Sequence, residues 1–205
     1  VTSDDVYPDY LDFSLEEATT LSGIIAALEG IPLIIGDGNS FREYVNISHG
    51  IKEEHGTRIG NGNYLMAYSH VAHDCRIGDH VILANAVNLA GHVEVESHAT
   101  VGGLTPVHQF VRIGAHVMIQ AGTRLGKDIP PFTMAGREPV SFTGINSIGL
   151  RRRGFQNDTI YAIQEVYRII YQRGLNISDA LEFVLANLPA SKERDEIVMF
   201  ITESN

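Results

Sequence analysis

Three histidines each lie shortly after an aliphatic residue of a regularly spaced series: His73, His92 and His108. Each lies one to three positions after an aliphatic residue, and these aliphatic residues are 18 positions apart: Val71, Leu89 and Val107. Histidine takes up and returns a proton near neutral pH, and a neighbouring carboxylate can orient and support its charged form. Asp74 directly follows His73 and is the candidate for this support, but neighbouring residues on a strand point to opposite faces, so the pair would require the geometry of a corner.

The alignment of these histidines depends on a six-residue period. An aliphatic residue recurs at every sixth position from Ile59 to Leu125, and a small or β-branched residue follows four positions later from Leu65 onward. The same register extends upstream to Ile35, interrupted by a polar stretch at 48–57 that we interpret as a loop. Neither a helix nor a simple strand has this period.

A period of six is typical of the hexapeptide repeat of left-handed parallel β-helices, in which three hexads form one triangular coil. Each coil covers only its neighbours, so the stack buries a continuous core. Glycine often follows the aliphatic residue, as at Gly60, Gly78 and Gly114, where we expect the backbone to turn a corner without a Cβ clash. A coil of 18 residues would place His73, His92 and His108 along one edge.

Two other interpretations of the histidines remain open. The side chains can simply be solvated, or they can hold zinc, as in the γ-class carbonic anhydrases of the same fold. Those zinc sites include two histidines five positions apart, a spacing that this chain lacks. We therefore predict no metal. The other histidines show no such alignment and are interpreted as loop or surface residues: His49, His55, His80, His98 and His116.

The flanks of the repeat differ from it. We expect an atypical segment at 1–33 with a helix opened by Ser14 and ending near Gly30, the β-helix at 34–131, a linker at 132–154 and helices at 155–205. Asn157 or Asp158 is the predicted cap of the first of these helices. Asn176 or Ser178 begins the second, and the third runs from about Ser191 to Thr202. The predicted fold class is mainly β with an α-helical C-terminal domain.

Composition narrows the function classes. The net charge of −10 over 205 residues argues against a broad nucleic-acid surface, because phosphate binding needs accumulated positive charge. A membrane span needs about 18 consecutive apolar residues, and the sequence contains no such run. The N-terminus also lacks a signal-peptide pattern. We therefore expect a cytoplasmic protein. The single cysteine, Cys75, falls on a small inward position and is expected to pack in the core.

Five short strings carry a family resemblance. Segments 70–75, 89–93, 107–110, 113–118 and 149–155 read HVAHDC, LAGHV, VHQF, IGAHVM and GLRRRGF. They closely resemble the UDP-N-acetylglucosamine O-acyltransferases, which begin lipid A synthesis, and the resemblance runs from about Ile34 to the C-terminus. It implies transfer of a 3-hydroxyacyl group from acyl carrier protein to the 3-hydroxyl of UDP-N-acetylglucosamine by a homotrimer with active sites between subunits. It also implies no cofactor beyond the carrier's phosphopantetheine.

The resemblance also implies roles for individual residues. His73 would be the base, Asp74 its support, and the Gly91 N–H the donor to the developing oxyanion. The residues implied to bind the substrates are His70, His92, His108, Gln109, Asn146, Arg152 and Arg153. Guanidinium groups suit bidentate contact with phosphate, which fits the arginine pair.

Departures from the family pattern leave alternatives open. Coils that the family carries before this point are absent from 1–33, and Ile148 stands where well-known members carry a glutamate. The chain can therefore be a fragment or an inactive shortened homologue. A separate alternative keeps the fold but acylates an amino-sugar acceptor. Ala121 and Gly122 leave room in the expected acyl groove, and the acyl length stays open.

Overall fold

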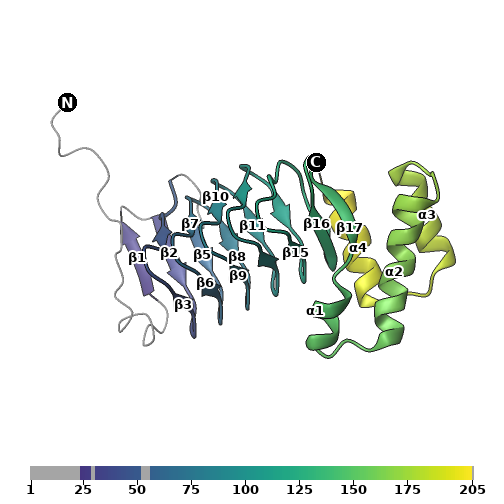
Figure 1. The fold of residues 1–205 in the computed structure, drawn as a ribbon, viewed down its shortest axis with the longest axis horizontal. Helices are drawn as coiled ribbons and strands as arrows, with labels where there is room; N and C mark the ends of the chain where they lie inside the picture. The colour runs from purple at the N-terminus through teal and green to yellow at the C-terminus, as the bar shows by residue number, and fades with distance from the viewer. Residues whose placement is uncertain (1–23, 29–30, 52–55, 205) are drawn as a thin grey trace.

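The computed structural model describes residues 24–28, 31–51 and 56–204, which form a left-handed parallel β-helix followed by a helical domain (Figure 1). The prediction of the fold class is thereby confirmed. Successive coils stack along the long axis of the molecule, and the helices lie at the C-terminal end of the stack. No helix of the described segments is long and apolar enough to span a bilayer.

Three sheets form the sides of the prism, and we name each after one strand. The β5 face contains β1 (Ile24–Leu28), β2 (Ile31–Ile35), β5 (Thr57–Ile59), β8 (Arg76–Ile77), β11 (Glu94–Val95) and β14 (Arg112–Ile113). The β7 face contains β4 (Asn46–Ile47), β7 (His70–Val71), β10 (Asn88–Leu89) and β13 (Pro106–Val107). The β6 face contains β3 (Ser40–Phe41), β6 (Tyr64–Leu65), β9 (Ile82–Leu83), β12 (Thr100–Val101), β15 (Met118–Ile119), β16 (Thr133–Gly136) and β17 (Ser141–Ile145).

The periodic aliphatic residues fill the interior of the β-helix. Val71, Leu83 and Leu89 have no exposed surface, and the small inward residue Cys75 is equally buried. Burying one such aliphatic side chain contributes about 1.5–3 kcal/mol. Burial also raises the pKa of the Cys75 thiol to about 12, so this residue packs, as predicted, and forms little thiolate.

The corners of the prism lie three residues after each inward aliphatic, where the backbone adopts positive φ. Asp74, His92 and Phe110 have φ of 59°, 59° and 67° on successive coils. The predicted Cβ clash at the glycines that follow the inward aliphatic residues is confirmed, but the corner itself lies two residues later, and Gly78 is outside the set with positive φ. A Cβ at Gly78 would lie 2.7 Å from the Ser97 nitrogen, so close approach of the next coil requires the glycine.

The N-terminal helix prediction is wrong where the structure describes the chain. Residues 24–28 form β1, which pairs antiparallel with β2, with Ile24 opposite Ile35. An added strand covers the open edge of the β5 face, and the β-branched residues of this segment suit a strand. The remainder of the predicted helix and residues 52–55 of the predicted loop lie outside the described residues, while Thr57 already belongs to β5.

The C-terminal part contains more regular structure than the sequence indicates. The linker at 132–154 forms the antiparallel pair of β16 and β17 and the short helix α1 (Ser147–Arg152). Three longer helices follow: α2 (Asn157–Gln172), α3 (Ile177–Asn187) and α4 (Lys192–Glu203). Gln156 rather than Asn157 or Asp158 is the N-terminal cap residue of α2, whereas Asn176 and Ser191 cap α3 and α4 as expected.

The helical domain has its own core, and that core is tied to the β-helix. Tyr167 is buried and donates a hydrogen bond of 2.6 Å to the Pro131 carbonyl oxygen. Arg112 of β14 lies over the Phe200 ring of α4 at 4.6 Å and 3.5 Å from the Glu203 carboxylate. The two parts therefore share a contact surface at the last coils.

Candidate active site

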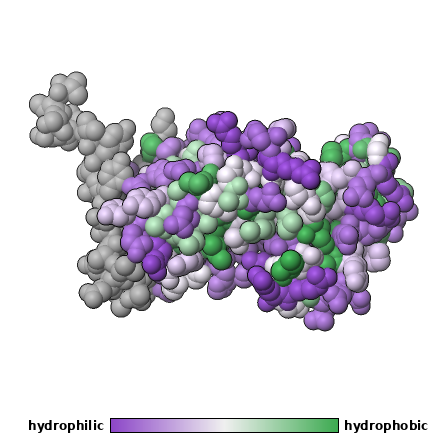
Figure 2. Space-filling model, viewed as in Figure 1, coloured by the Kyte–Doolittle hydropathy of each residue, from purple (hydrophilic) through white to green (hydrophobic). Residues whose placement is uncertain are grey.

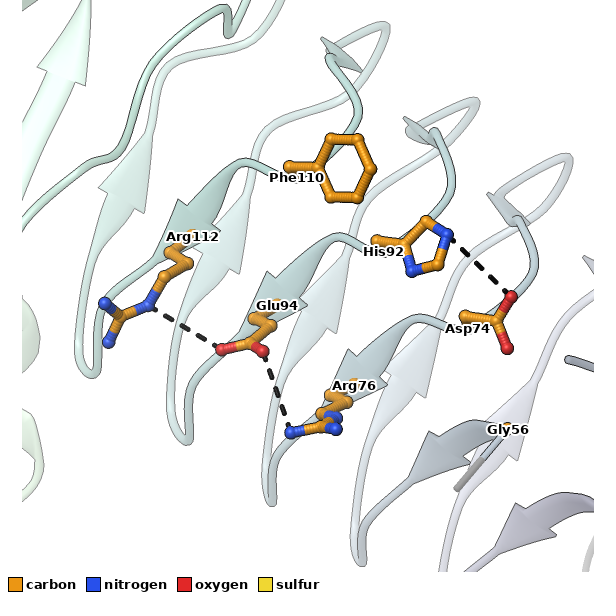
Figure 3. Close-up of a pocket in the computed structure, with 7 residues that line it drawn as sticks. All are labelled: Gly56, Asp74, Arg76, His92, Glu94, Phe110 and Arg112. Atoms are coloured by element: carbon orange, nitrogen blue, oxygen red, sulfur yellow. Dashed lines mark ion pairs between the residues drawn. The ribbon is translucent and has the colours of Figure 1, made fainter. Parts of the chain in front are cut away.

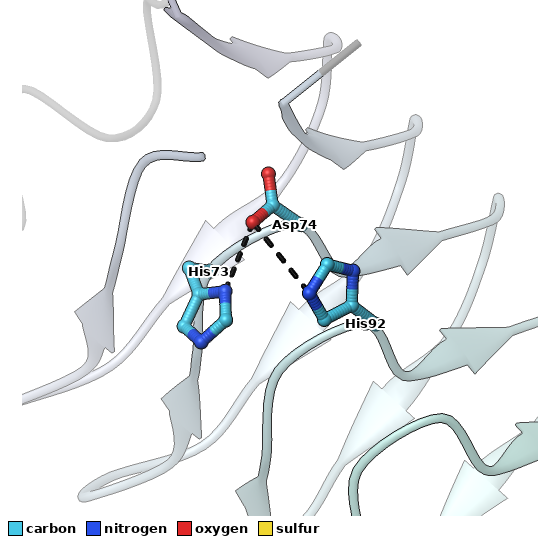
Figure 4. Close-up of side chains that lie close together, drawn as sticks. All are labelled: His73, Asp74 and His92. Carbon is cyan, nitrogen blue, oxygen red and sulfur yellow. Dashed lines mark hydrogen bonds and ion pairs between the residues drawn. The ribbon is translucent and has the colours of Figure 1, made fainter. Parts of the chain in front are cut away.

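His73 and Asp74 form a hydrogen-bonded pair at the corner between the β7 and β5 faces (Figure 4). His73 Nδ1 lies 2.9 Å from Asp74 Oδ2. Neighbouring side chains on a flat strand point to opposite faces, so this contact depends on the left-handed conformation of Asp74. The corner geometry that the predicted pair requires is present.

The loop between β4 and β5 holds the Asp74 carboxylate from the other side. The Ile51 N–H lies 3.3 and 3.2 Å from the two carboxylate oxygens of Asp74, and the Asp74 N–H donates to Thr57 Oγ1 at 2.8 Å. The Asp74 side chain has no exposed surface. The sequence did not identify Ile51 and Thr57 as partners of Asp74, because the length of the inserted loop does not reveal which residues it packs against.

His92 brings a second imidazole to the same carboxylate. Its Nε2 lies 3.9 Å from Asp74 Oδ2, and its ring meets that of His73 edge-on at 5.2 Å. Its other side stacks on Phe110, with ring centroids 4.8 Å apart. The predicted column of three histidines is thus partly wrong: Phe110, not His108, follows His92 at the corner, and the 18-residue spacing from His92 would have identified it.

An open groove of about 290 Å³ runs beside this corner (Figure 3). The residues that line it come from successive coils: Gly56, Asp74, Arg76, His92, Glu94, Phe110 and Arg112. Glu94 lies between Arg76, at 3.8 Å, and Arg112, at 3.7 Å. The groove therefore joins the histidine corner to a row of alternating charges on the β5 face.

Gly91 lies against the ring of His73. A Cβ at position 91 would be 2.5 Å from Cε1 and 2.6 Å from Nε2 of His73, so only glycine lets the ring lie over this backbone. Among the described residues the Gly91 N–H donates to no backbone carbonyl, whereas its carbonyl accepts from Phe110. Within the described part of the chain this N–H therefore has no backbone partner, at a position close to His73 Nε2.

His70 and His108 lie on the β7 face. His70 Nδ1 is 2.7 Å from Asn46 Oδ1, and burial lowers the pKa of His70. His108 is more exposed, and its Nδ1 lies 3.1 Å from the carbonyl oxygen of Gln109. The structure thus places both histidines and Gln109 on one side of the prism near the His73 corner.

The three residues predicted near α1 do different things in the structure. Asn146 caps α1 by accepting from Gly149 and donates to the His116 carbonyl oxygen at 2.9 Å. Arg153 donates to the His98 carbonyl oxygen at 2.7 Å, while Arg152 is exposed. Asn146 and Arg153 therefore attach α1 to the β-helix and leave Arg152 pointing to solvent.

A second histidine row lies on the corner between the β5 and β6 faces, and the interpretation of these histidines as unaligned is wrong. His80, His98 and His116 stack with centroid distances of 5.0 and 4.8 Å, and Phe132 continues the stack at 5.6 Å. They occupy equivalent corner positions 18 residues apart, a spacing that is visible in the sequence. Burial, with His98, Arg153 and Lys192 nearby, lowers the pKa of His116 to about 4.

A metal is the other group that the corner can accommodate. His73, Asp74 and His92 offer three ligand atoms within 4.8 Å of one another, and two imidazoles with a carboxylate suit a borderline cation such as zinc. The contact of 2.9 Å between His73 Nδ1 and Asp74 Oδ2 also has the length of a direct hydrogen bond.

A β-helix of hexapeptide repeats with a histidine–carboxylate pair at a corner is the arrangement of a hexapeptide transferase, and the model of the bacterial transferase hexapeptide matches residues 56–91. The model of UDP-N-acetylglucosamine O-acyltransferase, domain 2, matches residues 128–205. The UDP-N-acetylglucosamine acyltransferase from Bacteroides fragilis is 47% identical, over 83% of this chain and 67% of that one, with a TM-score of 0.79. The Campylobacter jejuni enzyme is 34% identical, over 89% and 72%, with a TM-score of 0.81. The chain belongs to the UDP-N-acetylglucosamine O-acyltransferase family.

Curated relatives match over a shorter stretch. The acyl-[acyl-carrier-protein]–UDP-N-acetylglucosamine O-acyltransferase of Chlorobium phaeobacteroides is 49% identical over 78 residues, which are 38% of this chain and 30% of that protein. The matched part thus spans about 30% of the length of this relative.

Proposed function

We propose that this chain transfers a 3-hydroxyacyl group from acyl carrier protein to the 3-hydroxyl of UDP-N-acetylglucosamine, the first step of lipid A synthesis. The observation that carries the proposal is the contact of 2.9 Å between His73 Nδ1 and Asp74 Oδ2, in a chain of this family. Phosphopantetheine on the carrier protein belongs to the substrate, and the reaction uses no further cofactor.

His73 acts as the general base. Because its Nδ1–H is held by Asp74, its Nε2 presents a lone pair that takes the proton of the sugar hydroxyl. The sugar oxygen attacks the thioester carbonyl carbon, and the negative charge on the carbonyl oxygen is stabilised by the Gly91 N–H. When the intermediate collapses, the carbon–sulfur bond breaks and the thiolate takes the proton from His73. Asp74 stabilises the imidazolium that exists between these steps.

The remaining predicted site residues bind the two substrates or hold the residues that bind them. We place the sugar and the acyl donor against His92 at the corner and against His70, His108 and Gln109 on its β7 side. Arg152 is free to contact phosphate, since its side chain is exposed at the end of α1. Asn146 and Arg153 contribute by fixing α1, and with it Arg152, on the β-helix.

We place the active sites between subunits of a cytoplasmic homotrimer. The β6 face carries outward apolar side chains that include Tyr64, Ile82 and Met118. Leu104 and Tyr68, on the corner between the β6 and β7 faces, are 72% and 61% exposed. Figure 2 shows apolar patches spread along the β-helix between hydrophilic regions. Apolar surface of this kind is what a second copy of the chain would cover.

The experiment uses the chain with 3-hydroxyacyl carrier protein and UDP-N-acetylglucosamine, and mass spectrometry of the nucleotide sugar. We expect one acyl group per sugar in an ester linkage, and no product from the 3-deoxy sugar. A His80→Ala variant, altered at the corner between the β5 and β6 faces, should behave like the parent. No product from the parent chain would refute the proposal, and acylation of the 3-amino sugar alone would replace it by the amine acceptor.

A further inference from the structure

We propose that Asn46 is a positioning residue that holds His70 with its proton on Nδ1, so that His70 Nε2 accepts a hydrogen bond from an O–H or N–H group of the sugar substrate. The positioning is a property of the free protein, whereas the bond to the sugar rests on the proposed function. Asn46 lies outside every motif that the sequence analysis singled out.

The contact between these residues is built into the pairing of two strands. Asn46 on β4 and His70 on β7 are direct partners in the parallel β7 face. Asn46 Oδ1 lies 2.7 Å from His70 Nδ1. A carboxamide oxygen only accepts hydrogen bonds, so His70 Nδ1 must donate and therefore carries the proton.

The strand on the other side of His70 also carries an asparagine, and comparison of the two asparagines shows that the contact with Asn46 is specific. Asn88 on β10 is the partner of His70 on the other side, so two asparagines flank the histidine in one row. The Asn88 amide nitrogen donates instead to the Ala86 carbonyl oxygen at 2.9 Å. Asn46 alone of this pair contacts the imidazole.

The difference between an amide and a carboxylate partner separates the roles of His70 and His73. Both histidines direct Nδ1 to an oxygen, but Asp74 carries a charge that stabilises an imidazolium, whereas Asn46 is neutral. Burial lowers the pKa of His70, which further favours the neutral ring. The lone pair on Nε2 of a neutral ring binds a donor without removing its proton, so His70 binds and His73 takes the proton.

Long-range ¹H–¹⁵N NMR of the imidazole nitrogens tests the positioning in the free protein. His70→Gln assigns the His70 signals by their loss. We expect Nδ1 to be the protonated nitrogen of His70 in the parent, and Nε2 to become protonated in Asn46→Leu. Asn88→Leu is the matched control and should leave the tautomer unchanged. A parent His70 protonated on Nε2, or a tautomer that is insensitive to Asn46→Leu, would overturn the proposal.

Steady-state kinetics test the second part of the proposal, which is the hydrogen bond between His70 Nε2 and the sugar. Asn46→Leu should raise KM for the nucleotide sugar about tenfold, the value of roughly one hydrogen bond, while kcat changes much less. Asn46→Asp should restore the Nδ1–H tautomer and part of the KM, with a changed pH profile of KM, because its carboxylate favours the imidazolium of His70. A fall in kcat alone would contradict binding through His70. Because the NMR measurement needs no turnover, the expected tautomers with an inactive parent would refute the proposed function and leave the positioning role of Asn46 standing.

Discussion

Asp74 Oδ2 accepts a hydrogen bond of 2.9 Å from Nδ1 of the preceding residue, His73, because Asp74 occupies a prism corner with φ of 59°. On an extended strand the two side chains would point apart. The fold therefore assembles the base and its support from adjacent residues, and the buried carboxylate is held in place by the Ile51 N–H.

Asp74→Asn keeps the shape of the side chain but removes its charge. We expect kcat to fall by about two to four orders of magnitude, since the amide cannot stabilise the imidazolium form of His73. Binding of UDP-N-acetylglucosamine should change little. Steady-state kinetics and calorimetry measure the two quantities, and a variant with parental kcat would show that Asp74 does not support the base.

Gly91→Ala tests the packing of His73 against the next coil. The added methyl group would lie 2.5 Å from the ring of His73, so the ring must move and kcat should fall about 100-fold. Gly126→Ala is the matched control, because a Cβ there meets nothing within 4 Å. The thermal midpoints of both variants identify any loss that comes from unfolding. Similar kcat values for the two variants would argue against the close approach.

His116→Phe tests the histidine stack through the pH dependence of stability. The folded pKa of His116 is about 4, below the ordinary value of 6.5, so the neutral ring stabilises the fold above pH 6.5. That stability is lost as the pH falls from 6.5 towards 4, because the unfolded chain then binds a proton that the folded chain does not. At pH 5 we expect a loss on the order of 1 kcal/mol, after allowance for screening at a partly exposed ring.

Phenylalanine can keep the stack between His98 and Phe132 without titrating. Urea unfolding of the parent and of His116→Phe at pH 7.5 and pH 5 gives the comparison. The parent should lose more stability than the variant between these pH values. Equal losses would mean that His116 titrates normally in the fold.

Removal of metal ions should leave acyl transfer unchanged. His73, Asp74 and His92 can bind a divalent cation, yet the proposed base requires a proton on His73 Nδ1 and no metal. The measurement is the rate after dialysis against EDTA, with added zinc as the reverse test. Zinc should inhibit by occupying the same three side chains, and a rate that depends on metal would contradict proton transfer by His73.

The sequence predicts the coils well because one inward aliphatic residue per hexad is a local requirement. It predicts contacts between coils only where the coil length is constant. The stack of His80 and His98 follows from an 18-residue spacing, but Asn46 and His70 are 24 residues apart because the loop after β4 lengthens that coil. An 18-residue register therefore cannot find the Asn46 contact, or the stacked pair of Tyr44 and Tyr68.

The end of the β-helix shows a second limit. The helix periods identify α2, α3 and α4, whereas α1 has only six residues and too little pattern to detect. Its place depends on Asn146 and Arg153, which hydrogen-bond to corner carbonyl oxygens rather than to side chains. Every residue has a backbone carbonyl, so residue types do not reveal such hydrogen bonds. Both residues were therefore predicted only as substrate contacts.

The most direct test of the account is the rate of acyl transfer by His73→Ala, measured together with the dissociation constant of UDP-N-acetylglucosamine. We predict that kcat falls by about two to four orders of magnitude while the sugar nucleotide binds nearly as tightly as to the parent. Equal kcat values for His73→Ala and the parent would contradict the assignment of His73 as the general base.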